Sequence, residues 1–159
     1  MEILKKEDIM ATVRELYLYI MNTEWAYRYY ENIAREVVKK ENANTSSDKH
    51  KWKSAQQVRK GIIPKLLSKG IIKQDLGKNE AKQLDQMIYN DLMEYVADNT
   101  FKYVLFIENR DLPYNVPPAA NKNEAASLAQ MWMRENFISE AVLDVYKGIE
   151  LVESIHIYA

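Results

Sequence analysis

The stretch Phe101-Lys-Tyr-Val-Leu-Phe-Ile-Glu108 decides the fold class of this chain. It is aromatic and β-branched over eight residues, a composition that predicts a largely buried strand. At the C-terminus, residues 149–158 alternate apolar and polar side chains after Gly148, and this alternation predicts a second strand. We expect the two segments to pair with each other as antiparallel neighbours.

Residues 7–96, which precede these strands, have the pattern of helices. Apolar side chains recur at spacings of three and four from about residue 7 to residue 40 and again over 79–96. The first of these runs has one gap at Thr23, where side-chain oxygens can cap a new turn, so we expect the helix to kink or restart there.

The lysine-rich region after the polar loop 42–48 predicts two helices. The first covers about residues 49–60 and takes its cap from the loop. Gly61 and Pro64 interrupt the pattern, and proline is well placed in the first turn of a helix. A short second helix is therefore expected over residues 64–69.

The chain between the two predicted strands divides into a loop and a helical region. Residues 109–123 hold three of the four prolines, and a structureless segment of this length is often functional. Residues 124–147 carry apolar side chains at helical spacing, with a break near Asn136. We therefore predict an α+β fold, a mostly helical single domain over residues 1–159 with a small antiparallel sheet.

The composition argues against most catalytic chemistry. The chain has no cysteine, which excludes disulfides, thiolate metal sites and cysteine nucleophiles. Its four glycines cannot build a phosphate-binding loop, and its two histidines, His50 and His156, form no metal-binding motif. Glu108 and Asp111 flank a loop, but two such carboxylates are common by chance. We predict no catalytic residue, no cofactor and no metal.

Targeting signals are also missing from the sequence. No apolar run follows the lysines near Met1, and no stretch approaches the roughly 18 apolar residues of a membrane span. We therefore expect a cytoplasmic protein that does not bind membranes.

The net charge of −1 hides a strong partition along the chain. Residues 1–50 carry −1, residues 51–82 carry +7 and residues 83–159 carry −7. Such asymmetry can mark binding partners. The alternative is that the basic and acidic regions face each other within the fold, or are merely solvated.

The acidic C-terminal half predicts a surface for a basic protein. Tyrosine supplies 11 aromatic side chains, and tyrosine is favoured at interfaces because it buries area while keeping a polar tip. Complementary charge speeds encounter with a basic target. The alternative is that the tyrosines fill the core and the carboxylates keep the protein soluble. The candidate partner-binding residues are Asp98, Glu108, Asp111, Tyr114, Glu135, Glu140 and Asp144.

The basic segment 51–82 supports an alternative function, a nucleic-acid-binding regulator. Residues 58–74 resemble in part the end of a winged-helix recognition helix, with a leucine-rich turn followed by Lys-Gly-Ile-Ile. This resemblance implies that lysines meet phosphates and that Trp52 packs against a base or sugar. The sequence departs from the pattern at residues 75–79, which lead into a helix and leave no room for a wing. The candidate residues are Lys51, Trp52, Lys53, Arg59, Lys60, Lys65, Lys69 and Lys73.

The chain as a whole resembles the small anti-CRISPR proteins of phages and mobile elements that inhibit type II-A Cas9 nucleases. The resemblance rests on size, on a composition rich in lysine, asparagine and tyrosine, and on the stretch Glu24-Trp-Ala-Tyr-Arg-Tyr-Tyr-Glu-Asn32. These inhibitors share no diagnostic motif, so no residue role is transferred. The resemblance implies a stoichiometric, non-catalytic protein that docks on Cas9 in the bacterial host cell. A phage assembly chaperone or oligomeric scaffold, exposing Trp25 and Tyr29, is a further alternative.

Overall fold

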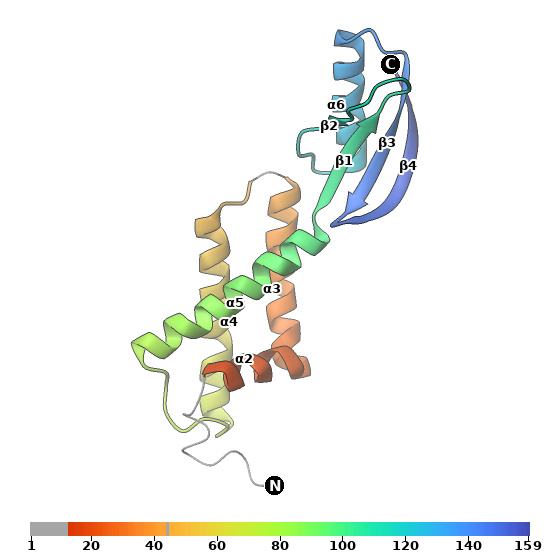
Figure 1. The fold of residues 1–159 in the computed structure, drawn as a ribbon. Coiled ribbons are helices and arrows are strands. Elements are labelled where there is room, and N and C mark those ends of the chain that lie inside the picture. Colours follow the sequence, from red (N-terminus) through yellow and green to blue (C-terminus); the bar gives the residue numbers. More distant parts are fainter. Residues whose placement is uncertain (1–12, 44) are drawn as a thin grey trace. The chain divides into compact units, whose positions relative to one another are not determined.

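The computed structural model describes residues 13–43 and 45–159 (Figure 1). Residue contacts divide the chain into two compact units. The helical unit comprises the described residues up to Val37 together with Ser47–Tyr95, and the sheet unit comprises Val38–Ser46 and Val96–Ala159. The predicted α+β class, mostly helical with a small antiparallel sheet, is confirmed. The single domain stays a prediction.

Within the described part of the chain, the helical unit is built from α2 (Val13–Asn22), α4 (Asp48–Ser68) and the greater parts of α3 (Glu24–Asn42) and α5 (Lys78–Asn99). The break predicted at Thr23 is confirmed, because α2 ends at Asn22 and α3 begins at Glu24. The Thr23 carbonyl accepts a hydrogen bond from the Tyr27 N–H at 2.8 Å. Residues 7–12 of the predicted first helix lie outside the described residues. The core of this unit contains Leu16, Ile20, Tyr30, Val58, Ile62, Leu66, Leu84, Ile88 and Leu92.

Helix α4 is continuous, so the predicted break at Gly61 and Pro64 is wrong. Its N-terminus is capped as expected, since the Ser47 hydroxyl accepts from the His50 N–H at 3.1 Å. The helix continues through both residues because Ile62, Ile63 and Leu66 are buried there, and this burial outweighs the local cost of glycine and proline. Gly61 is needed for packing, because a Cβ at this position would overlap the ring and hydroxyl of Tyr29.

A partly buried carboxylate ties α5 to α2 and α3. Asp91 accepts a hydrogen bond from the Tyr17 hydroxyl at 2.8 Å and another from the Tyr30 hydroxyl at 2.6 Å. Tyr30 is fully buried, and its ring packs edge-on against Tyr95. Each carboxylate oxygen thus has one phenolic donor, which stabilises the charge in place of water.

Alkaline pH is expected to destabilise the helical unit between pH 10 and about 12. Burial, and then the hydrogen bond to Asp91, raise the pKa of Tyr17 from 10.0 to about 12, and the pKa of Tyr30 is raised in the same direction by the same causes. The unfolded chain therefore loses these protons first, so their stabilisation is complete below pH 10 and is lost as the pH rises towards 12. Urea unfolding of wild-type protein from pH 9 to 12 should show this fall.

The double variant Tyr17→Phe, Tyr30→Phe should be less stable at pH 9, and its stability should depend less steeply on pH above 10. Tyr158→Phe, in the sheet unit, is the matched control and should follow the wild-type profile. Parallel profiles for wild type and the double variant would contradict the assignment.

The sheet unit contains strands β1 (Phe101–Phe106), β2 (Tyr114–Asn115), β3 (Glu140–Lys147) and β4 (Glu150–Tyr158), with helix α6 (Lys122–Glu135). The strand order is β2-β1-β3-β4, and every neighbouring pair is antiparallel. Both predicted strands exist, but the prediction that they pair directly is wrong. β3 lies between them, so that Leu105 faces Leu143 and Leu143 faces Ile155.

The prediction of a helical region over residues 124–147 is wrong in its second half. Helix α6 ends at Glu135, close to the break expected at Asn136, and residues 140–147 form β3. Ala141, Leu143 and Val145 are buried and alternate with side chains on the other face, which is the period of a strand. The apolar side chains of this segment fit either period, and pairing on both edges decides for the strand.

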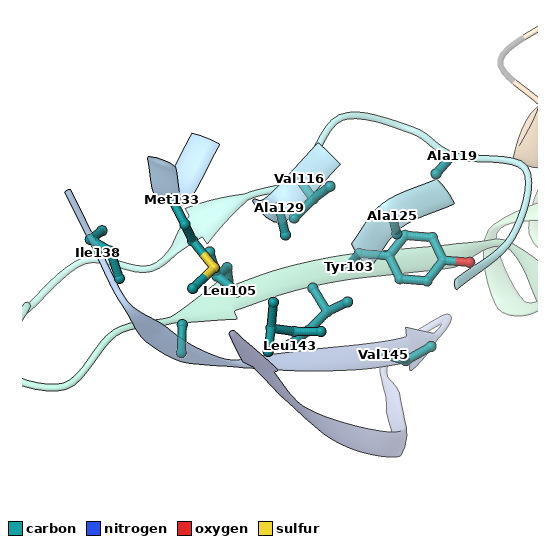
Figure 2. Close-up of a cluster of buried hydrophobic side chains, with 12 residues drawn as sticks. Tyr103, Leu105, Val116, Ala119, Ala125, Ala129, Met133, Ile138, Leu143 and Val145 are labelled. Carbon is teal, nitrogen blue, oxygen red and sulfur yellow. The ribbon is translucent and has the colours of Figure 1, made fainter. Parts of the chain in front are cut away.

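Helix α6 covers one face of the sheet. Figure 2 shows Leu105 of β1 next to Met133 of α6 and the ring of Tyr103 next to Ala125, and Leu143 of β3 belongs to the same buried cluster. Leu128 and Trp132 of α6 are half-buried, whereas Met131 of α6 and Val142 of β3 are exposed. The predicted loop 109–123 contains the two residues of β2.

Candidate protein-binding end of the sheet unit

One end of the sheet unit gathers several segments that are distant in sequence. β1 ends there and β3 begins there, because Phe106 pairs with Val142. The last residue of β4, Tyr158, pairs with Glu140 and accepts a hydrogen bond from the Gln130 side chain of α6 at 2.9 Å. Figure 1 shows this end at the C-terminus of the chain. We call it the acidic end.

The loop between β1 and β2 is held against α6 by aromatic contacts. The Tyr114 ring stacks on the Trp132 ring with centroids 4.1 Å apart and planes at 6°. The Arg110 guanidinium lies 5.9 Å from the centre of the same indole ring. These contacts fix the loop residues between them, including Asp111 and Leu112, next to the C-terminal half of α6.

Helix α6 ends in a left-handed turn occupied by Phe137. The Ile138 N–H donates to the Met133 carbonyl at 2.8 Å and the Phe137 N–H donates to the Arg134 carbonyl at 3.3 Å, the two bonds of a Schellman motif. Phe137 has φ 57°, a conformation that costs an L-residue about 1–2 kcal/mol. Its side chain is 96% exposed, so no contact inside the described chain offsets that cost.

Helix α4 ends in the same motif and has glycine at the equivalent position. The Ile71 N–H donates to the Leu66 carbonyl at 2.9 Å and the Gly70 N–H donates to the Leu67 carbonyl at 3.1 Å. Gly70 has φ 71°, which glycine adopts without strain. One helix therefore uses the residue that suits the turn, and the other places an exposed phenylalanine there.

Further apolar side chains lie exposed at or near the acidic end. Leu112 in the β1–β2 loop is 82% exposed. Phe106 and Tyr158, which end their strands there, and Val142, the third residue of β3, are also exposed. Exposed aromatic and aliphatic side chains at one end of a fold are a common mark of a binding surface when they lie close together.

Four of the seven residues predicted for partner binding lie at the same end of the sheet unit. Glu108 and Asp111 lie exposed in the β1–β2 loop, Glu135 ends α6, and Glu140 begins β3. Among the described residues, Glu108, Asp111 and Glu135 form no ion pair, and a Glu140 oxygen lies 3.7 Å from the His156 ring. The acidic end therefore carries both exposed apolar side chains and exposed carboxylates.

The other three predicted residues have different positions. Tyr114 is half-buried on Trp132 and supports the loop. Asp144 lies on the sheet face opposite α6, where it accepts from the Ser154 hydroxyl at 2.6 Å. Asp98 lies at the other end of the sheet, with its carbonyl close to Gly148.

The predicted nucleic-acid residues all lie in the helical unit, but three of them are engaged in packing. Lys51 is buried, and Trp52 packs edge-on against Tyr89 with centroids 5.5 Å apart. The Arg59 side chain donates to the buried Asp85 at 2.7 Å. The exposed members of the set are Lys53, Lys60, Lys65, Lys69 and Lys73.

Lys65 and Lys69 lie over the ring of Trp25, which the scaffold alternative expects to be exposed together with Tyr29. Their ammonium groups are 5.6 and 4.8 Å from the centre of the Trp25 indole ring. Trp25 is half-buried, and Tyr29 is half-buried against Gly61. Both aromatic side chains therefore contribute to packing within the helical unit.

Sequence reasoning missed Phe137 and Leu112. An apolar residue close to a helix end normally reads as core, and only the backbone angle and the exposure of Phe137 distinguish it. Lys49 is also absent from the predicted nucleic-acid-binding residues, because it precedes the basic segment 51–82. Its position on α4, about one turn before the exposed Lys53 and about two turns before the exposed Gln57, was the available signal.

The comparisons with known proteins identify no relative. No protein-family model, curated protein or solved structure matches this chain. Within the described residues, no group of three or more histidine, aspartate or glutamate side chains is arranged to hold a metal ion. None of the described helices combines the length and apolar character that a membrane crossing requires.

Proposed function

We propose that this protein is a non-catalytic inhibitor that binds a basic surface of a bacterial defence nuclease of the Cas9 type through its acidic end. The observation that carries the proposal is Phe137. It has an unfavourable backbone conformation and an exposed ring, while Gly70 satisfies the same turn without strain. A contact between the Phe137 ring and a binding partner would offset the cost of this backbone conformation.

The surroundings of Phe137 favour a basic protein partner. Exposed aromatic side chains act as anchors when they enter a pocket and lose their water. The carboxylates of Glu108, Asp111, Glu135 and Glu140 would steer such an anchor towards positive charge and disfavour acidic partners. Nucleases that hold DNA present basic surfaces, and Cas9-type enzymes hold their heteroduplex in a positively charged channel.

Two inhibitory steps follow from docking of this kind. A protein seated in the basic channel would exclude DNA, and a protein seated on a nuclease domain would hold that domain away from its strand. The resemblance to anti-CRISPR proteins supports the nuclease as the target, and the proposal places the protein in the bacterial cytoplasm where such enzymes act.

Titration of DNA cleavage tests the proposal. Addition of the protein to a type II-A Cas9–guide complex should reduce cleavage in a dose-dependent manner and reach its limit near equimolar ratio. A stoichiometric endpoint is expected because the inhibitor is not consumed and does not turn over. Unimpaired cleavage at large excess of the protein, across several type II-A enzymes, would refute the proposal.

A further inference from the structure

We infer that the exposed face of α4 binds the phosphate backbone of duplex DNA, an activity separate from the proposed protein binding by the acidic end. Six of the exposed residues of α4 follow one another at intervals of three or four, which places them on one stripe along the helix. The stripe consists of Lys49, Lys53, Gln57, Lys60, Pro64 and Ser68.

The lysines of this stripe have no carboxylate partners. After Asp48, α4 contains no acidic residue, and Lys49, Lys53 and Lys60 form no ion pair with the described residues. Lys49 and Lys53 are also like charges four residues apart, which is unfavourable by about 0.2–0.5 kcal/mol in a helix. The arrangement therefore costs stability.

Helix α3 shows that the chain pairs surface charges elsewhere. Arg28 lies 2.6 Å from Glu24, and Arg35 lies 2.9 Å from Glu31, both at a spacing of four residues. Ion pairs at a spacing of four residues would also fit α4. Because the stripe has none among the described residues, the ammonium groups of its lysines are available to an external anion.

The groove beside the stripe is also free of carboxylates. It is lined by Lys53 and Lys60 together with Tyr29, Gln56, Gln57 and Gly61. The amide side chains can donate hydrogen bonds to phosphate oxygens, and the lysines supply the charge. Lys65 and Lys69, held over Trp25, extend the basic surface beyond the C-terminal half of α4.

The spacing of the stripe fits a nucleic acid. At about 1.5 Å per residue, Lys49 and Lys60 lie about 16 Å apart along the helix axis. One strand of B-DNA presents a phosphate about every 3.4 Å along its axis, so several consecutive phosphates fall within reach. Contact with the backbone alone predicts binding that depends on salt and not on base sequence.

Fluorescence anisotropy with a labelled DNA duplex tests the inference. Three phosphate contacts predict that log K falls with log salt at a slope of about −3. The variant Lys53→Glu, Lys60→Glu should bind at least about tenfold more weakly and reduce the slope to about −1, because it removes two contacts. Circular dichroism should show an unchanged helix content, since both side chains are exposed.

Lys102→Glu, Lys147→Glu is the matched control, because it makes the same change in net charge on exposed residues of the sheet unit. It should keep wild-type affinity and slope. Equal losses in the two double variants, or no duplex binding by wild type at 50 mM salt, would overturn the inference. Displacement of the duplex by an equal concentration of polyglutamate would also overturn it, because the stripe would then recognise acidic protein.

Discussion

Replacement of Arg59 by alanine is expected to lower the free energy of unfolding of the helical unit by about 3 kcal/mol. The Arg59 guanidinium lies 2.7 Å from a carboxylate oxygen of Asp85, whose side chain is 4% exposed. Removal of the arginine leaves that carboxylate buried without its ion-pair partner, and the desolvation penalty is then uncompensated. Urea unfolding followed by circular dichroism measures the loss.

The two partners are expected to behave asymmetrically. Asp85→Ala should cost less than Arg59→Ala, because the Arg59 side chain retains 21% exposure and can reach water. The double variant Arg59→Met, Asp85→Leu should recover much of the loss, since apolar side chains of similar volume often replace a buried ion pair. Lys60→Ala, an exposed neighbour, is the control and should stay within about 0.5 kcal/mol of wild type. Equal costs for the two single variants would contradict this account.

Replacement of Phe137 by glycine is expected to separate stability from binding. Glycine relieves the left-handed backbone but gains freedom in the unfolded chain, so the free energy of unfolding should stay unchanged or rise by up to about 1 kcal/mol. The loss of the anchor should weaken partner binding by about 2–4 kcal/mol, roughly 30- to 700-fold. Few substitutions that remove a large apolar side chain leave a protein as stable as before.

Phe101→Ala is the matched control for Phe137→Gly. Phe101 is 38% exposed and begins β1, at the end of the sheet opposite the acidic end. Its removal should leave partner affinity within about threefold of wild type. If both variants weakened binding equally, the acidic end would not be the binding surface.

Local sequence patterns predict the existence of most elements but not their pairing. The aromatic and β-branched run at residues 101–108 forms β1, and the alternating C-terminal segment forms β4. The sequence predicts a helix for the segment that forms β3, because its apolar residues fit both the helical and the strand period. Only the pairing of β3 with β1 on one edge and β4 on the other settles that ambiguity.

Glycine and proline predict the end of a helix only where the backbone geometry requires such a residue. Gly70 ends α4 in a left-handed turn, as its position suggests. Gly61 and Pro64 lie inside the same helix, because the buried side chains around them hold it together. The close approach of Tyr29 that requires Gly61 depends on tertiary packing and leaves no mark in the local sequence.

The sequence predicts the acidic residues of the candidate site but not its exposed apolar residues. The acidic residues come from three separate segments, and the order of strands brings Glu108, Asp111, Glu135 and Glu140 to one end. The basic candidates lie in the helical unit, but so do three carboxylates of the acidic segment, Asp85, Asp91 and Glu94, so the charge partition along the chain follows the division into units only in part. Phe137 needed the structure, because its conformation and exposure identify it.

The most direct test of the central claim is calorimetric titration of a type II-A Cas9–guide complex with wild-type protein and with Phe137→Gly. The account predicts one-to-one binding for wild type and a loss of at least about 30-fold for the variant, which should unfold at the same or a higher urea concentration. Equal binding of both proteins, or no binding of wild type to any of several type II-A enzymes, would contradict it.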